Sequence, residues 1–181
     1  MKEEGHMAGQ LGIAVIGCGY WGANYVRVLG ELPGVRLCVV CDERPERLQE
    51  VARRFPAVSL TTQLDAALSC DGVDAVIVCT TATTHYTVTR RALMMGKHVL
   101  VEKPLTMVSA DADDLIERAE SKSTVLMVGH TFVYNAGIRK VKEYVETGRD
   151  QVYYLLSTRS GIWRRTTSPS STTCSRARPS G

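Results

Sequence analysis

A glycine pattern near the N-terminus most constrains how this chain can fold. Gly17, Gly19 and Gly22 follow the apolar run 11–16 and open a stretch with helical periodicity, 21–32. In that context the first glycine permits a tight turn, the second lets a ligand approach the backbone, and the third lets helix and strand pack closely. Free N–H groups at the start of the helix then attract phosphate oxygens. A purely structural glycine turn is the alternative to a dinucleotide site, whose predicted contacts are Gly17, Gly19, Tyr20, Trp21 and Gly22.

An acidic residue lies where such a site needs one. Asp42 ends the second predicted strand, twenty residues after Gly22. A carboxylate there accepts hydrogen bonds from the hydroxyls of an adenosine ribose and repels a 2′-phosphate, and Glu43 adds to the repulsion. NAD is therefore the predicted cofactor, and the basic residues Arg44 and Arg47 leave NADP as the less favoured one. A plain turn residue at the end of a strand is the alternative reading of Asp42.

Apolar runs alternate with helical patterns along most of the chain. The predicted strands span residues 11–16, 35–41, 57–60, 75–79, 97–101 and 125–128. The predicted helices span residues 21–32, 45–55, 64–69 and 85–95, and a further helix, capped by Ser109, has the inner face Ala112, Leu115, Ile116 and Ala119. This alternation predicts an α/β fold, a Rossmann-type doubly wound parallel sheet covered by helices on both faces.

The C-terminal part departs from this alternation. A helix at 135–147 and a strand at 152–157 predict the truncated start of an α+β substrate domain. Residues 164–181 contain nine Ser or Thr and no Leu, Ile, Val or Phe, so burial cannot offset their ordering entropy. The predicted organisation is a disordered leader at 1–10, an NAD-binding domain at 11–129, a truncated substrate domain at 130–161, and a disordered tail resembling out-of-frame translation at 162–181.

Charge and cysteine content narrow the classes of protein. Residues 1–158 carry 17 basic and 19 acidic side chains, a net charge of −2, which gives no reason to expect nucleic-acid binding. No apolar run is long enough to span a bilayer, so no membrane association is expected. Cys38 and Cys41 have a CxxC spacing inside a predicted strand, where they would point to opposite faces and form neither a disulfide nor a metal site. Buried free cysteines are typical of a reducing cytoplasm.

A second motif, Glu102-Lys103-Pro104, directly follows the predicted strand 97–101. The carboxyl ends of strands in an open α/β sheet form the ligand crevice, so Lys103 is expected near the nicotinamide. Its ammonium can hydrogen-bond a substrate hydroxyl, and a lowered pKa would let this lysine share the proton released on oxidation. A solvated loop lysine is the alternative.

These segments together resemble one known family. The resemblance, over about residues 11–160, is to the glucose–fructose oxidoreductase/inositol dehydrogenase/MocA family, and it rests on AVIGCGYWGANYVRVL, CD, TTATTHYTVTRRALMMGKHVLVEKPLT and MVGHTFVYNAGIRKVKEYVETG. It implies hydride transfer between NAD and a secondary alcohol of a sugar, nucleotide-sugar or cyclitol. Lys103 would be the catalytic lysine beside the reacting carbon and would contact both cofactor and substrate. The bond from this lysine to Pro104 is often cis in the family.

The resemblance also implies roles for other residues. The family's Thr-Pro-x-x-x-His loop corresponds to residues 80–85, with Thr81 in place of the proline. The further implied cofactor contacts are Thr80, His85 and Glu102, and a water-facing position at the start of a helix is the alternative for His85. The implied substrate-binding residues are His130, Tyr134 and Asn135, for which packing between domains is the alternative.

The resemblance breaks near the C-terminus. Family members are considerably longer and typically add an Asp and a His from their second domain, whereas the last histidine here is His130 and the last acid is Asp150. Two functions therefore stay open, an NAD-dependent oxidoreductase and a catalytically incomplete NAD-binding fragment. An S-adenosylmethionine methyltransferase, the third alternative, would leave residues 102–104 without a role. Full-length relatives are expected to be homo-oligomers.

Overall fold

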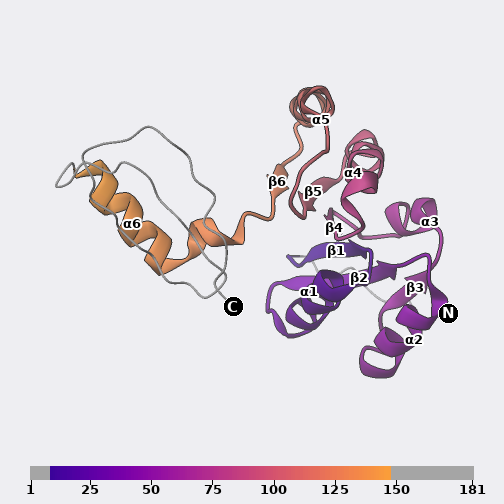
Figure 1. Cartoon of the computed structure of the whole chain (residues 1–181). Helices are drawn as coiled ribbons and strands as arrows, with labels where there is room; N and C mark the ends of the chain where they lie inside the picture. Colours follow the sequence, from indigo (N-terminus) through magenta and orange to yellow (C-terminus); the bar gives the residue numbers. More distant parts are fainter. Residues whose placement is uncertain (1–8, 148–181) are drawn as a thin grey trace, which may run out of the picture. The chain divides into compact units, whose positions relative to one another are not determined.

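The computed structural model describes residues 9–147, which contain one six-stranded sheet. Its strands are β1 (Leu11–Ile16), β2 (Val35–Cys41), β3 (Ser59–Thr61), β4 (Ala75–Val78), β5 (His98–Val101) and β6 (Leu126–Val128). They pair in the order β3-β2-β1-β4-β5-β6, and all neighbours run parallel (Figure 1). The predicted Rossmann-type doubly wound sheet is confirmed. The strand order reverses between β1 and β4, the position at which such sheets bind ligands beyond their carboxyl ends.

Helices connect the strands as predicted, with ends that differ from the predicted ones by at most two residues where both were given. The α-helices are α1 (Tyr20–Glu31), α2 (Pro45–Arg54), α3 (Leu64–Leu68), α4 (His85–Met94), α5 (Ser109–Ser121) and α6 (Ala136–Glu146). Two short 3-10 helices are η1 (Ala82–Thr84) and η2 (Thr131–Tyr134). Pro45 lies in the first turn of α2, where its missing N–H costs no hydrogen bond.

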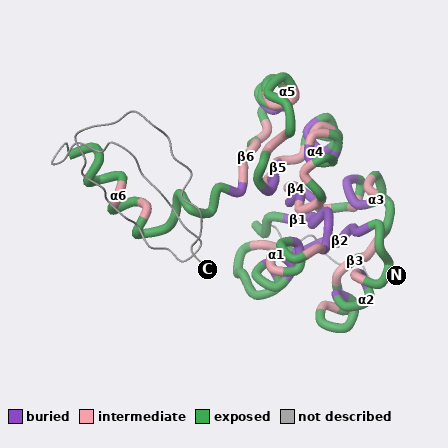
Figure 2. Tube along the Cα trace, in the orientation of Figure 1, coloured by how far each residue is buried: buried purple, intermediate pink, exposed green. Residues whose placement is uncertain are grey.

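Two apolar clusters fill the two faces of the sheet. On one face, Val26 of α1 and Leu48 of α2 belong to a cluster with Val40 of β2. On the other, Leu93 of α4 and Leu115 of α5 belong to a cluster with strand residues, and α3 joins the same cluster. Figure 2 shows the buried segments along the strands and the inward sides of these helices. Covering both faces explains why the strands read as continuous apolar runs.

The CxxC prediction was wrong in its geometry. The register between β1 and β2 shifts between Ile13 and Ala14, which pair with Leu37 and Val39, so Cys38 is the extra residue of a β-bulge. The bulge interrupts the strand's alternation, and Cys38 and Cys41 consequently belong to the same apolar cluster rather than to opposite faces. Both are buried free thiols.

Two details of the helices also differ from prediction. Ser109 is the first residue of α5 and not its cap, a position held by Val108 without any side-chain hydrogen bond. Ile116, assigned to the inner face of α5, is 47% exposed, because Leu115 and Ala119 supply the buried side of the helix. Leu32, the last residue of the predicted helix 21–32, lies just beyond the end of α1 and is likewise 47% exposed.

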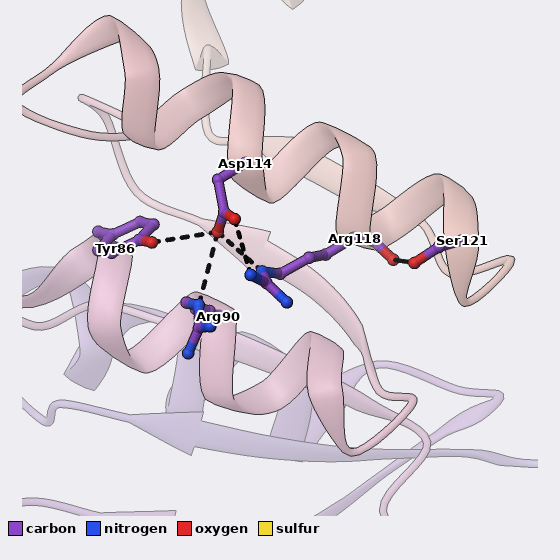
Figure 3. A network of polar contacts seen from close by, with 5 residues as sticks. All are labelled: Tyr86, Arg90, Asp114, Arg118 and Ser121. Atoms are coloured by element: carbon purple, nitrogen blue, oxygen red, sulfur yellow. Dashed lines mark hydrogen bonds and ion pairs between the residues drawn. The ribbon is translucent and has the colours of Figure 1, made fainter.

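A polar network joins α4 and α5 (Figure 3). Asp114 accepts hydrogen bonds from the Tyr86 hydroxyl at 3.1 Å and from the Arg118 guanidinium at 2.8 Å, and it forms an ion pair with Arg90 at 3.5 Å. The Arg118 guanidinium in particular holds the pKa of Asp114 below its ordinary value. Ser121 extends the network by donating to the Arg118 carbonyl oxygen. The network therefore ties two helices together on their polar side.

The chain divides into two compact units, residues 1–130 and 131–181. In the second unit, the Asn135 side chain caps α6 by accepting from the N–H groups of Gly137 and Ile138. None of the α6 residues is buried against the described part of the chain. The predicted strand 152–157, the tail 162–181 and most of the leader lie outside the described residues. Between residues 9 and 147, no helix has the length and apolar character needed to cross a membrane.

We predict that neighbouring residues of α5 differ sharply in their contribution to stability. Leu115 is completely buried, so Leu115→Ala should lower the free energy of unfolding by about 2–5 kcal/mol through lost burial and a cavity. Ile116→Ala removes a half-exposed side chain and should cost less than about 1 kcal/mol. Urea denaturation followed by circular dichroism measures both. Equal losses for the two variants would contradict the observed orientation of α5.

Candidate functional site

The glycine turn connects β1 to α1 at the carboxyl edge of the sheet. Gly17 has φ +90°, a left-handed conformation that favours glycine, and a Cβ there would lie 2.8 Å from the backbone of Cys79. A Cβ on Gly22 would overlap the carbonyl oxygen of Gly17. The fold itself therefore requires both glycines, as their predicted roles in turning and close packing imply.

Gly19 differs from its two partners. A Cβ on this residue would meet only the Arg47 guanidinium, at 2.9 Å, which is the far end of a flexible side chain. Gly19 also has ordinary backbone angles, φ −74° and ψ −159°. The packing of the described residues thus does not demand a glycine here. Its bare Cα leaves room for a ligand against the backbone, which is what pyrophosphate binding needs.

The start of α1 offers unused hydrogen-bond donors. Gly19 occupies the N-cap position without a side-chain hydrogen bond, and the first turn contains no acid. Among the described residues, the N–H groups of Tyr20 and Trp21 donate to no acceptor. Both side chains are exposed, at 80% and 47%. Such an uncapped helix start attracts anions through its N–H groups and its dipole.

Asp42 lies at the end of β2, beside this turn, and is buried. Its Oδ2 accepts from the Cys18 N–H at 2.7 Å, and its Oδ1 accepts from the Arg44 N–H at 2.9 Å. The Arg44 side chain adds a longer contact, Nε to Oδ1 at 3.4 Å. Burial alone would raise the pKa of Asp42, but these hydrogen bonds outweigh it and lower the pKa below its ordinary value. The carboxyl group is therefore a fixed negative charge beside the glycine turn.

The Glu102-Lys103-Pro104 turn follows β5, two positions along the sheet from β1. Glu102 is buried, its Oε1 accepts from the Tyr25 hydroxyl at 2.9 Å, and its Oε2 accepts from the Lys103 N–H at 3.3 Å. The hydrogen bond and burial raise the pKa of Tyr25, burial being the larger cause. The Lys103 side chain is exposed and forms no ion pair within residues 9–147. The bond from Lys103 to Pro104 is cis.

His85 does not face water, which excludes that alternative. It is 1% exposed, with Nδ1 at 2.7 Å from the carbonyl oxygen of Pro104 and Nε2 at 3.1 Å from that of Thr80. Both ring nitrogens thus lie within hydrogen-bond distance of a protein carbonyl oxygen. Because these carbonyls belong to the loops after β5 and β4, the ring links the two strand ends.

Thr80 keeps one unused group. Its Oγ1 is buried and has no hydrogen-bond partner in the described part of the chain. The following loop has Thr81 in place of the family's proline. There the Thr84 hydroxyl donates to the Thr81 carbonyl oxygen at 2.9 Å and closes a turn over residues 81–84. A buried hydroxyl without a partner at a strand end is a candidate ligand contact.

The remaining thiols near the site are poor nucleophiles. Burial, with Glu102 nearby, raises the pKa of Cys79 to about 12, and burial also raises the pKa of Cys18. Both cysteines therefore stay protonated at neutral pH. Within residues 9–147, no cluster of three His, Cys, Asp or Glu residues is arranged to hold a metal ion.

The predicted substrate-side residues come from both compact units. His130 ends the first unit and is exposed, with its N–H donating to the Val128 carbonyl oxygen. Tyr134, 61% exposed, and Asn135 belong to the second unit. Because Asn135 uses its side-chain oxygen to cap α6, only its amide NH₂ is available to a ligand.

Two residues at the site were not assigned to it from the sequence. Arg47 lies over Gly19, and Tyr25 anchors Glu102 from 77 residues away. Neither residue belongs to a recognisable sequence motif, since Arg and Tyr are common on helix surfaces. Only the turn of α1 against β1 and β5 brings Tyr25 to Glu102. The one signal in the sequence was the positive charge of Arg47, which was interpreted only as a feature that would accommodate NADP.

We predict that the three glycines of the turn separate into two groups. Gly22→Ala should lower the free energy of unfolding by several kcal/mol, about 3 or more, because its Cβ cannot fit beside the Gly17 carbonyl. Gly19→Ala should change stability by less than about 1 kcal/mol, because Arg47 can move away. Thermal and urea unfolding of the two variants provide the comparison. A strongly destabilised Gly19→Ala variant would show that this glycine also serves packing.

Comparison with known proteins identifies relatives of this chain. It is 32% identical over 152 residues to 2,7-anhydro-N-acetylneuraminate hydratase of Mediterraneibacter gnavus, which covers 83% of this chain and 40% of the relative. It is also 32% identical over 145 residues to inositol 2-dehydrogenase of Streptomyces avermitilis. That match covers 79% of this chain and 42% of the relative. The crystal structure of GenD2 from gentamicin A biosynthesis, in complex with NAD, matches with 34% identity and a TM-score of 0.73, covering 86% and 44%. The chain thus spans less than half the length of these relatives.

The family assignment rests on the domain that contains the six-stranded sheet. A family model described as "Oxidoreductase family, NAD-binding Rossmann fold" matches residues 11–130, which include the glycine turn, Asp42 and Lys103. That stretch is about two-thirds of the chain and coincides with the sheet and its covering helices. The chain belongs to the oxidoreductase family named after glucose–fructose oxidoreductase, inositol dehydrogenase and MocA, whose members have an NAD-binding Rossmann fold.

Proposed function

We propose that this chain binds NAD across the carboxyl ends of β1, β4 and β5. The observation that carries the proposal is the space at Gly19, which the protein's own packing does not need and which adjoins unused N–H groups at the start of α1. Arg47 supports it, because its guanidinium lies over this space and forms no ion pair with any described residue. A pyrophosphate would satisfy the donors and the guanidinium together.

The charge of Asp42 favours NAD over NADP. A buried carboxylate with a lowered pKa stays ionised, so it can accept hydrogen bonds from ribose hydroxyls and repel a 2′-phosphate. Arg44 is the residue that could attract that phosphate, but both its N–H and its side chain are engaged by Asp42. The same pair of residues therefore favours a free ribose over a phosphorylated one.

The nicotinamide half would lie between two strand-end loops. The unpartnered Thr80 hydroxyl and the exposed Lys103 side chain are the groups that these loops offer, with His85 and Glu102 behind them. When bound, NAD supplies the hydride acceptor. Lys103 Nζ, as a neutral amine, would accept a hydrogen bond from the substrate hydroxyl and take up its proton to become an ammonium as the alcohol is oxidised. Glu102 holds the backbone of this lysine through the Lys103 N–H.

The substrate class in this proposal is a secondary alcohol of a sugar, nucleotide-sugar or cyclitol. Its support is the family and the relative named inositol 2-dehydrogenase. His130, Tyr134 and the NH₂ group of Asn135 are the exposed polar groups proposed to contact it. We also propose a cytoplasmic location, supported by the five free cysteines of the described chain. Dinucleotide binding without turnover is the second candidate function, because the chain matches less than half of each relative.

We predict that Asp42→Asn removes the preference for NAD. The variant keeps the shape of the side chain and loses its charge, so NAD affinity should fall about tenfold while NADP affinity stays equal or rises. Isothermal titration calorimetry with both dinucleotides measures the ratio, and Asp65→Asn, an exposed carboxylate on α3, is the matched control. Unfolding curves must accompany the titrations because Asp42 also binds the Cys18 N–H. An unchanged ratio of affinities would remove the assigned role of Asp42.

We predict a different pattern for Lys103. Lys103→Met should leave NAD affinity within about threefold of wild type and reduce NAD reduction by about 10²–10⁴-fold, the usual effect of losing an acid–base group. The assay follows absorbance of the reduced cofactor with myo-inositol and a panel of sugars. Lys97→Met is the control, since that lysine donates to the Val73 carbonyl oxygen away from the crevice. Wild type that binds NAD but oxidises no alcohol in the panel would favour the second candidate function.

A further inference from the structure

His85 is one of the few buried polar side chains in the described residues, and the reaction proposed above gives it no task. It is the first residue of α4 and is 1% exposed. Its two ring nitrogens face two carbonyl oxygens, of Pro104 at 2.7 Å and of Thr80 at 3.1 Å. The strands that precede these residues, β4 and β5, are neighbours in the sheet, paired from Ala75–His98 to Val78–Val101. The imidazole therefore spans the gap between two adjacent strand-end loops.

The two contacts are not equivalent. A carbonyl oxygen only accepts hydrogen bonds, so each contact requires an N–H on the ring. A ring with a proton on both nitrogens can donate a hydrogen bond to both carbonyl oxygens, whereas a neutral ring can donate to only one of them. The distance from Nδ1 to the Pro104 carbonyl oxygen is the shorter of the two. We therefore expect a neutral ring to carry its proton on Nδ1 and to donate to Pro104.

We propose that His85 is a positioning residue that fixes Lys103 by holding the backbone of the next residue, Pro104. The inference rests on the function proposed for Lys103. A lysine side chain is long and flexible, so the region that its amine can reach is set first by the backbone that carries it. On the other side of the same turn, Glu102 Oε2 accepts from the Lys103 N–H and Glu102 Oε1 accepts from Tyr25. The backbone on both sides of Lys103 is thus held by a buried side chain.

Such positioning matters because hydride and proton transfer need reacting atoms near contact distance. Lys103 is exposed, and no ion pair with a described residue holds its side chain in place. The link to Thr80 has a second consequence, because Thr80 carries the buried hydroxyl without a partner. His85 thereby lies between two groups that the proposed nicotinamide site requires, Lys103 and the Thr80 hydroxyl.

Two amide substitutions separate the two contacts. In His85→Asn, the amide nitrogen takes the place of Nδ1 and can still donate to Pro104. In His85→Gln, the amide nitrogen takes the place of Nε2 and can still donate to Thr80, but the Pro104 contact is lost. Tyr86→Phe is the matched control, because it removes a hydrogen bond of the neighbouring residue, on the side of α4 that faces α5 (Figure 3).

The first measurement needs no cofactor. Hydrogen exchange in the full chain should show the amide of Lys103, which donates to Glu102 Oε2 within the turn, exchanging about tenfold faster in His85→Gln than in wild type. His85→Asn and Tyr86→Phe should retain the wild-type rates. Equal rates for the Asn and Gln variants would overturn the assignment of the Pro104 contact.

The second measurement reports on Lys103 in the presence of NAD. Acylation of Lys103 by an amine-reactive ester, followed by mass spectrometry, should be slowed at least about tenfold by saturating NAD in wild type and in His85→Asn. In His85→Gln this protection should largely disappear while NAD affinity stays within about threefold, because the pyrophosphate and ribose contacts lie elsewhere. If wild type binds NAD but Lys103 is not protected, the positioning role is overturned. If wild type does not bind NAD at all, the proposed function fails, and the exchange rates alone decide whether His85 holds the turn.

Discussion

The close approach of α1 to the end of β1 is the constraint on which the rest of this structure depends. Gly22 lies against the Gly17 carbonyl oxygen. This close contact allows the helix to begin as soon as four residues after the strand ends. A side chain at position 22 would push the helix away from the sheet. The N–H groups of its first turn would then no longer face the crevice, and Tyr25 would lose Glu102. One contact between two backbones therefore determines both the proposed anion site and the support of the lysine turn.

The interior places its polar groups at one edge of the sheet. Four polar or charged residues are buried in the described chain, and Asp42, His85 and Glu102 all lie beyond the carboxyl ends of strands. Burying such groups is costly unless they are hydrogen-bonded, and each of the three makes two or more hydrogen-bond contacts. Several of their partners are backbone groups of neighbouring loops. The loops around the crevice are consequently held in place by the protein itself, before any ligand contributes.

The parts that could be predicted from sequence were those governed by local rules. Apolar runs, helical periodicity and the glycine spacing gave the sheet, the helices and the turn, because strand alternation and backbone sterics act over a few residues. The errors arose where distant residues decide. The bulge at Cys38 depends on how β1 pairs with β2, and the exposure of Ile116 depends on how α5 meets the sheet. The role of His85 in linking two loops follows from a contact with Pro104 19 residues away, which no local pattern indicates.

In the proposed site, Asp42 both stabilises the fold and selects the ligand. An ionised carboxylate has about four acceptor positions, and here two are filled by backbone N–H groups of Cys18 and Arg44. The remaining contact, to the Arg44 side chain, is the longest, and that side chain is half exposed. About one acceptor position is left for a ribose hydroxyl, so a ligand can bind while all three contacts of Asp42 persist. Because those same backbone bonds keep Asp42 ionised, the charge that opposes a 2′-phosphate is maintained by the fold and not by the ligand.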